Sequence, residues 1–277
     1  PSIEIVAAAA ELEAEDLRRF YDLFARTERA MTLYSQGVNQ SVSGADKVNA
    51  ILNCHLATGR IGRAGMGPFS LTGQPNAMGG REVGALANQL AAHMGFTPDE
   101  VDRVGRFWKA PAIATRPGHK AVELFDAVLD GRIKAVWVAA TNPADSMPRA
   151  DRVRTALARC PLVIVSDIWP TDTTALADIV LPAAGWAEKD GTVTNSERRI
   201  SRQRGFRPAP GNARPDWWMF MQVARRMGWQ DAFPYAGPAD IFREHAALSA
   251  FENDGRRAFN LGALAGLDDA GYDALSP

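Results

Sequence analysis

The chain has 277 residues, of which 46% are hydrophobic, and its formal net charge is −1. This length and composition suit one large globular domain or two smaller ones, and they exclude a disordered or collagen-like chain. A charge balance this close to zero does not favour a nucleic-acid partner. The sequence has no apolar run of the roughly 20 residues that a membrane helix needs, so no membrane partner is expected.

The cysteines and histidines do not predict a metal site. Cys54 and Cys160 lie far apart in apolar-periodic segments, which favours buried reduced thiols over a disulfide. The four histidines are scattered, and no Cys/His group has metal-ligand spacing. The first ten residues also lack the basic start and long apolar core of a signal peptide. No catalytic residue and no metal ligand is therefore predicted within the chain.

The first third of the chain begins with a helical pattern over residues 4–29 and a short strand at 30–34. This strand runs into an amide-rich turn with one glycine, Ser35 to Ser41, which is a plausible ligand edge. Helical spacing of apolar residues returns at 46–58. The predicted order is helix, strand, polar turn and helix.

A Gly-rich stretch follows at residues 59–84, with eight glycines and two prolines. Long loops of this kind inside compact domains are usually functional or disordered. The apolar residues Phe69, Leu71 and Met78 favour an ordered, packed loop. Glycines also let backbone N–H groups approach a ligand closely, although the stretch matches neither the phosphate-loop nor the dinucleotide fingerprint.

Helices and strands then alternate. Helices are predicted at residues 81–93, 98–108, 120–130 and 149–159, and a short helical crossover at 171–177. Apolar runs predict strands at 133–139, 162–165 and 177–181. This alternation is typical of a parallel sheet with helical crossovers. We therefore expect an α/β fold, a Rossmann-like, mostly parallel sheet flanked by helices, with the long Gly-rich loop as an irregular excursion.

Polar residues stand at the ends of the predicted strands. Asn142 follows the strand at 133–139, and Ser166 and Asp167 end the next one. Open α/β sheets bind their ligands at the carboxyl ends of their strands. We expect four residues to line one common cleft there: Gln40, Asn142, Asp167 and Lys189.

The pattern weakens after Arg199. The basic segment at 200–212 is typical of a solvated loop, and Asp216 then opens a predicted helix, where it can cap the helix or favour its dipole. Residues 231–277 contain one predicted helix near 238–251. Their remainder is typical of a linker or an extended surface segment.

Five segments resemble the molybdopterin oxidoreductase family, in the order in which that family shows them. They are LYSQGVNQS, GRAGMGPFSLTGQPNAMGGREVG, ATNPADSMP, SDIWPTDTTALADIVLPAAGWAEKDGTVTNSERRISRQR and ARPDWWMF. Within the family, the sequence is most similar to the catalytic subunit of assimilatory nitrate reductase. Periplasmic nitrate reductases and formate dehydrogenases are close relatives. The resemblance runs from about Tyr34 through Trp229 and implies the central portion of a larger enzyme.

In that family, two molybdopterin guanine dinucleotides hold one molybdenum ion, and the central α/β region grips one dinucleotide. By motif position, Gln36 and Gln40 resemble the cofactor-contacting positions of the GxNQ turn, although several relatives carry Met where Gln36 stands. Asn142 resembles the polar residue after the third strand. Ser166 and Asp167 match the ribose- and guanosine-binding pair.

The resemblance also makes Lys189 the cofactor-binding lysine and Asp216 the guanine-reading acid. A carboxylate can accept from the adjacent ring and exocyclic N–H groups of guanine, and a lysine can supply a point charge for pyrophosphate. Simpler structural roles stay open. Asp216 could be only a helix cap, Asp167 a turn former and Lys189 a surface lysine.

The implied parent enzyme is cytoplasmic and reduces nitrate to nitrite by two electrons at molybdenum. Its 4Fe–4S cluster has ligands outside this chain, since neither cysteine matches the family's ligand motifs. The implied partners are nitrate, the remaining domains of the parent, and an electron donor protein or reductase subunit. Residues 1–230 would form the central dinucleotide-binding region and 231–277 an extension toward a final domain. The isolated chain is expected to be inactive.

Two alternatives stay open at this point. The chain could be a segment of a periplasmic nitrate reductase or a formate dehydrogenase, which use the same cofactor. It could also be a non-catalytic nucleotide-binding module that kept the fold without redox chemistry. Intact residues at the cofactor-contacting positions count against the second alternative.

Overall fold

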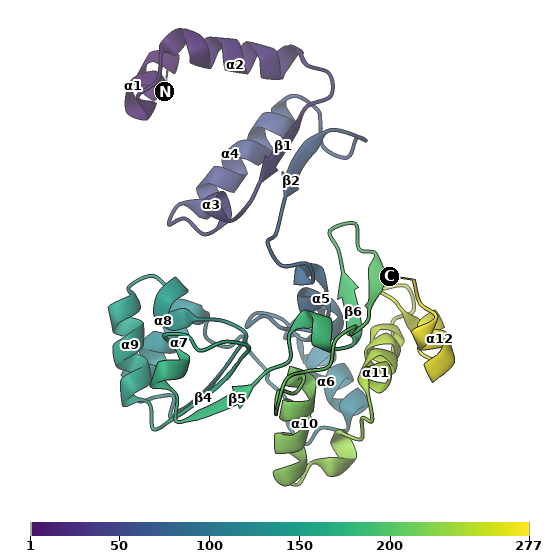
Figure 1. The fold of residues 1–277 in the computed structure, drawn as a ribbon. Coiled ribbons are helices and arrows are strands. Elements are labelled where there is room, and N and C mark those ends of the chain that lie inside the picture. Colours follow the sequence, from purple (N-terminus) through teal and green to yellow (C-terminus); the bar gives the residue numbers. More distant parts are fainter. Residues whose placement is uncertain (1, 277) are drawn as a thin grey trace. The chain divides into compact units, whose positions relative to one another are not determined.

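The computed structural model describes residues 2–276 and divides into two compact units, Pro1–Pro75 and Asn76–Pro277 (Figure 1). The division falls inside the Gly-rich stretch, whereas the sequence suggested a boundary near residue 230. That stretch is not one loop, since it contains strand β2 (Gly67–Ser70) and helix α5 (Ala77–Glu82). Phe69 and Leu71 are 37% and 42% exposed, so they do not pack it as expected. In the described part of the chain, no helix is long and apolar enough to cross a membrane.

The first unit joins helices to a two-stranded parallel sheet. Strand β1 (Met31–Tyr34) pairs with β2 from Met31↔Gly67 to Tyr34↔Ser70. The helices are α1 (Ile3–Ala10), α2 (Ala14–Arg26), α3 (Gln36–Asn39) and α4 (Gly44–Ala57). The single helix predicted at 4–29 is thus two helices, because Glu11 adopts a left-handed conformation with φ 55° that ends α1. The predicted polar turn after β1 winds into the short helix α3.

Two buried polar side chains hold this unit together. Arg60 is 3% exposed, and its guanidinium donates to the carbonyls of Phe24 at 2.6 Å and Thr27 at 2.5 Å. It thereby satisfies carbonyls at the C-terminal end of α2, a helix that buries none of its own residues. His55 is fully buried beside it. The expected burial of Cys54 is wrong, because α4 turns His55 rather than Cys54 toward the interior.

The second unit contains the predicted parallel sheet. Its strands are β3 (Ala135–Ala139), β4 (Leu162–Asp167) and β5 (Ile179–Pro182), in the order β3-β4-β5. Between them lie α8 (Pro143–Ser146), α9 (Ala150–Arg159) and the 3-10 helix η2 (Thr174–Leu176). Helix α7 (Ala121–Leu129) precedes β3, and Gly131 beyond its end has the expected left-handed φ of 75°. The sequence therefore predicted this sheet and its crossovers correctly.

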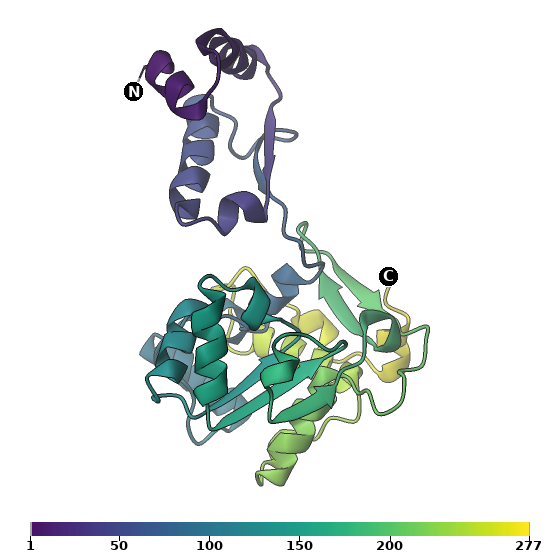
Figure 2. The ribbon, with the colours of Figure 1, turned by 60° about the vertical axis from the view of Figure 1, so that its left-hand side comes forward.

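Helices α7 and α9 lie side by side on one face of the sheet (Figures 1 and 2). The core between them contains Val138, Val163 and Val165, which alternate along their strands with residues of the other face. On that other face, the Trp137 ring lies 4.3 Å from Phe220 of helix α10 (Asp216–Arg226). Apolar side chains therefore pack on both faces of the sheet.

The predicted helix at 81–93 is wrong. Helix α5 ends at Glu82, and a 3-10 helix, η1 (Ala91–His93), is the next regular segment. The cause is Gly84, whose φ is 79° and whose missing Cβ would lie 2.6 Å from the backbone nitrogen of Ala91. The chain turns sharply there and packs on itself. The following helix, α6 (Pro98–Trp108), is as predicted, with a capping box at Thr97 and Glu100.

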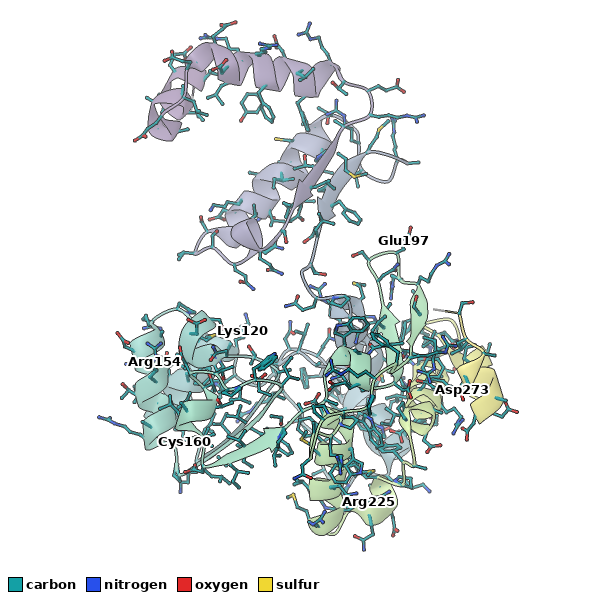
Figure 3. The ribbon with its side chains drawn as sticks, viewed as in Figure 1. Lys120, Arg154, Cys160, Glu197, Arg225 and Asp273 are labelled. Carbon is teal, nitrogen blue, oxygen red and sulfur yellow. The ribbon has the colours of Figure 1, made fainter. Side chains whose placement is uncertain are left out.

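The segments predicted as loops after Lys189 contain an antiparallel hairpin. Strand β6 (Gly191–Thr194) pairs with β7 (Ile200–Gln203), and Glu197 lies at the tip between them (Figure 3). The expected solvated basic segment is corrected in part, because Arg202 is only 6% exposed. Its guanidinium pairs with Asp190 at 3.4 Å and Asp273 at 3.1 Å.

The C-terminal segment belongs to the core of the second unit and is not an extended surface segment. It contains α11 (Pro238–Ala250), α12 (Asp269–Asp273) and the 3-10 helices η4 (Gln230–Ala232) and η5 (Gly262–Leu264). Leu248 and Phe259 form one hydrophobic cluster with Met94 and Val104. Residues beyond position 230 therefore complete the unit that begins at Asn76.

Candidate functional site: the carboxyl edge of the sheet and an arginine pocket

The carboxyl edge of the β3-β4-β5 sheet carries two of the predicted site residues. Asp167 ends β4, and Asn142 follows β3 after a short turn. The register pairs Ala139 with Ser166, so both strands end at the same level. Asn142 and Asp167 therefore lie on one edge, as the parallel sheet predicted.

Backbone hydrogen bonds connect this edge to the segment that precedes Asp216. Ala183 donates to the carbonyl of Asp167 at 3.0 Å and forms an isolated parallel bridge with Arg214. Arg214 also donates to Pro182 at 3.1 Å. The segment before α10 thus lies beside the end of β5, and α10 begins at Asp216. The expected position of Asp216 at the start of a helix is confirmed.

Lys189 and Asp216 form an ion pair, with 3.2 Å between Nζ and Oδ2. Their side chains are 31% and 24% exposed, so the pair is partly shielded from water. The other carboxylate oxygen, Asp216 Oδ1, is buried and has no hydrogen-bond partner among the described residues. Leaving a buried acceptor unpaired is costly. This oxygen therefore fits a ligand that supplies an N–H donor.

Asn142 and Asp167 are partly engaged by the protein. Asn142 Oδ1 accepts from the backbone nitrogen of Thr173 at 3.1 Å and from its hydroxyl at 2.7 Å, which ties together two turns of the edge. Its amide NH₂ group is the part that a ligand could bind. Asp167 Oδ1 accepts from the backbone nitrogen of Ile168 at 2.7 Å, as a turn former would.

Ser166 has a structural partner instead. Its side chain is fully buried, and its Oγ accepts from the indole nitrogen of Trp137 at 2.6 Å. This bond lies on the face of the sheet that α10 covers. The hydroxyl of Ser166 thereby positions Trp137 against Phe220 and stabilises the carboxyl edge of the sheet through this contact.

Gln36 and Gln40 belong to the first unit, at the two ends of α3. The turn is anchored to β2 by Ser35, whose hydroxyl donates to the carbonyl of Leu71 at 2.6 Å, and by Asn39, which donates to Ser70 at 3.2 Å. These bonds hold the amide-rich segment at the end of β1. That Gln40 meets the edge residues of the second unit in one cleft stays a prediction.

The sequence did not predict a second feature, a hollow lined by arginines. A hollow of about 480 Å³ in the second unit is lined by Arg81, Arg198 and Arg257, together with His93, Gln89 and three apolar residues. Arg198 lies 3.4 Å from His93 Nε2, and Arg257 Nε is buried without a partner in the described chain. None of the residues that line the hollow is a carboxylate. Such a concentration of guanidinium groups favours an anion.

Burial, and then the charge of nearby Arg103, lower the pKa of Arg257 from its ordinary value, whereas the charges of Glu100, Asp254 and Glu252 act in the opposite direction. Arg257 Nη2 donates to the carbonyls of Ser249 at 3.2 Å and Phe251 at 2.9 Å, so the protein already binds part of this guanidinium. Arg81 and Arg198 both lie in segments that resemble the family, but their separation in the sequence gave no sign that they share a pocket. Among residues 2–276, no cluster of three or more His, Cys, Asp or Glu residues could hold a metal ion.

Comparison with known proteins places the chain in a family. The molybdopterin oxidoreductase family model matches residues 7–226. The chain is 55% identical to a nitrate reductase of Klebsiella oxytoca over 276 residues, covering 99% of the chain and 32% of that protein. It is 53% identical to a nitrate reductase of Shewanella frigidimarina (strain NCIMB 400), covering 98% of the chain and 29% of that protein. The chain thus spans about a third of the length of these relatives.

A solved structure shows the same fold. Acetylene hydratase from Pelobacter acetylenicus superposes with a TM-score of 0.60 at 15% identity, covering 99% of the chain and 38% of that protein. The α/β fold with parallel sheets flanked by helices is thereby confirmed. Because the family model matches most of its length, the chain belongs to the molybdopterin oxidoreductase family.

Proposed function

We propose that the chain is the central portion of a molybdenum-dependent nitrate reductase of the assimilatory type. It would supply part of the site for one molybdopterin guanine dinucleotide. The observation that carries the proposal is the Lys189–Asp216 pair, whose buried Asp216 Oδ1 lacks a partner in the described chain. The 53% and 55% identities to nitrate reductases support the choice within the family.

The edge residues divide the recognition of the dinucleotide among them. Asp216 Oδ1 would accept from a guanine N–H, and the ion pair with Lys189 would orient the carboxylate. The second oxygen of Asp167 would accept from a ribose hydroxyl, as acidic residues of dinucleotide folds do. Asn142 would donate its amide N–H, while Ser166 supports the edge through Trp137. Gln36 and Gln40 would add contacts from the first unit.

The arginine pocket would receive the substrate anion. Nitrate is a planar monoanion, and a guanidinium fork matches two coplanar oxygens. Arg81 and Arg198 would bind and orient it while apolar neighbours such as Phe259 exclude water. When bound, the molybdenum cofactor supplies the two-electron chemistry that converts nitrate to nitrite. The electrons would come from a donor protein or reductase subunit, and the parent enzyme would work in the cytoplasm with a 4Fe–4S cluster held outside this chain.

The proposed functional division keeps residues 1–230 as the dinucleotide-binding region. Residues 231–277 would lead toward a final domain, although they pack within the second unit. Formate is also a planar monoanion that an arginine pocket can bind, so a formate dehydrogenase is the second candidate. A periplasmic nitrate reductase would use the same residues.

The test is the variant Asp216→Ala in the enzyme that contains this chain. Loss of a charge-assisted hydrogen bond typically costs about 1.5–3 kcal/mol, so we expect lower molybdenum and guanine content after purification. The matched control is Asp231→Ala on η4, which should retain both. Nitrate and formate are then assayed in parallel with the wild type. Unchanged guanine content in Asp216→Ala would contradict the guanine-reading role, and turnover of formate alone would select the second candidate.

A further inference from the structure

A buried polar contact connects the two segments that carry Arg81 and Arg198. Glu82, the last residue of α5, is 2% exposed, and its Oε2 accepts from the hydroxyl of Thr194 at 2.8 Å. Thr194 is the last residue of β6 and is 4% exposed. At the other end of α5, Asn76 Oδ1 accepts from the backbone nitrogen of Thr194 at 2.9 Å. Both ends of the helix thus hold one residue of the hairpin.

Gly79 makes this arrangement possible. A Cβ at Gly79 would lie only 2.1 Å from Asn76 Oδ1. Only a residue without a side chain lets the Asn76 amide fold back over the helix toward Thr194. The contact is therefore built into the local sequence of α5, where Asn76, Gly79 and Glu82 follow one another at helical spacing.

The contact sits where it controls the position of Arg198. A two-stranded hairpin is only marginally stable alone. The contacts that anchor its strands to the rest of the unit therefore determine where its turn lies. On the β7 side, the backbone nitrogen of Arg202 donates to the carbonyl of Ser276 at 2.8 Å, which fixes the base of the hairpin. On the β6 side, Thr194 is the last anchored residue before the turn. Asn195 then organises the turn, because its Oδ1 accepts from the backbone nitrogen of Arg199 at 3.0 Å.

The other side of the contact adjoins Arg81, which directly precedes Glu82 in α5. Helix α5 therefore presents one arginine to the pocket while its neighbouring side chain holds the hairpin that presents the other. Two apolar side chains could pack α5 against β6 equally well, but they would not fix one position of β6 along α5. Buried hydrogen bonds fix direction as well as distance.

We propose that Glu82 and Thr194 are positioning residues for the arginine pocket, which set Arg81 and Arg198 at the separation that one small oxyanion requires. This inference rests on the proposed function of the pocket. Glu82 does not touch the anion in this scheme. It acts through the hairpin: its Oε2 makes the contact with Thr194, while its buried Oε1 has no partner among the described residues.

The first test uses the enzyme that contains this chain. Thr194→Val removes the hydroxyl at nearly constant shape, whereas Thr194→Ser keeps it. We expect Thr194→Val to raise KM for nitrate about tenfold while kcat changes less than about twofold, since substrate binding is lost without loss of chemistry. Thr194→Ser should restore the wild-type KM. Glu82→Gln, which keeps an acceptor oxygen, should likewise be milder than Glu82→Ala.

The second test needs no cofactor. In the 277-residue chain, the side-chain Nε–H signals of Arg81 and Arg198 are followed by NMR during titration with sodium nitrate. In the wild type both should shift with one midpoint, because one anion binds both groups. In Thr194→Val and Gly79→Ala the two midpoints should separate, and the amides of residues 195–199 should exchange faster with solvent.

The outcomes separate the inference from the proposed function. If wild-type enzyme reduces no nitrate and neither arginine signal responds to it, the proposed function of the pocket fails. If nitrate is reduced and bound, but folded Thr194→Val retains the wild-type KM, a common midpoint and slow exchange of the turn, the positioning role is overturned. A lower melting temperature with unchanged KM would mean that the contact only stabilises the fold, which also contradicts the proposal.

Discussion

His55 shows how burial of one side chain links stability to pH. Its ring is fully buried, with Nε2 at 2.7 Å from the hydroxyl of Thr32, and Nδ1 has no partner among the described residues. Burial, and then the charge of Arg60, lower the pKa of His55 below its ordinary value of 6.5. The folded first unit therefore holds the neutral imidazole. The unfolded chain can protonate it.

We expect the first unit to lose stability as the pH falls from 7 to 5. Below pH 6.5 the unfolded state binds a proton that the folded state excludes, so unfolding becomes more favourable, by at most about 1.4 kcal/mol per pH unit for this one group. Hydrogen exchange of the α4 amides at pH 7, 6 and 5 measures the effect. His55→Gln should flatten this dependence, whereas His119→Gln at an exposed position should leave it unchanged. A wild-type slope in His55→Gln would assign the acid sensitivity to other groups.

At the scale of the element, local sequence patterns were sufficient to predict helices and strands whose buried residues are apolar. Strands β3 and β4 and helices α6, α7 and α9 have apolar periodicity, and their ends carry clear signals such as Pro98 and Gly131. The hairpin was missed because its buried side chains are polar. Thr194 and Arg202 are buried because Glu82 and Asp273 arrive from distant segments. No window of local sequence contains those partners.

The candidate site likewise has one part that the sequence could predict and one part that it could not. Asn142 and Asp167 could be placed from the sequence, because parallel strands put their carboxyl ends on one edge. The arginine pocket could not, because helix α5, the hairpin turn and the segment after α11 meet only through tertiary packing. Its guanidinium groups look like ordinary surface charges until those three segments are assembled.

Helix α5 and the turn after it allow a matched pair of substitutions. Gly84→Ala should destabilise the second unit by about 1–3 kcal/mol, because its φ of 79° is strained for alanine and the new Cβ would meet the Ala91 backbone. Gly80→Ala meets nothing within 4 Å and should stabilise α5 by about 0.5–1 kcal/mol. All seven tryptophans lie in the second unit, so urea unfolding followed by tryptophan fluorescence reports on it. Equal effects of the two substitutions would refute the packing around Gly84.

At the scale of the whole molecule, the second unit is held together by residues from its two ends. Met94 and Val104 pack with Leu248 and Phe259, and the guanidinium of Arg202 lies 4.4 Å from the ring of Tyr272. Local composition made the C-terminal segment look like a linker because the part after the predicted helix is rich in Gly and Asp. Apolar residues of this segment, such as Leu248 and Phe259, nevertheless close the core. The arginine pocket therefore depends on the segment beyond residue 230, which supplies Arg257 and Phe259 to its lining.

The last prediction is that the 277-residue chain alone reduces no nitrate. The proposed reaction needs the two-electron chemistry that a molybdenum cofactor would supply and an electron path from a donor, and this chain is proposed to hold only part of the cofactor site. A 4Fe–4S cluster requires four thiolates, whereas the chain has two cysteines, Cys54 exposed and Cys160 buried. The edge around Asp216 would offer the dinucleotide only part of the contacts that a complete enzyme supplies, so we expect weak occupancy. Molybdenum and iron are measured in the purified chain, and nitrate reduction is assayed with reduced viologen beside the complete enzyme as the positive control. Stoichiometric molybdenum together with turnover in the isolated chain would overturn this prediction and would require a metal ligand among its own residues.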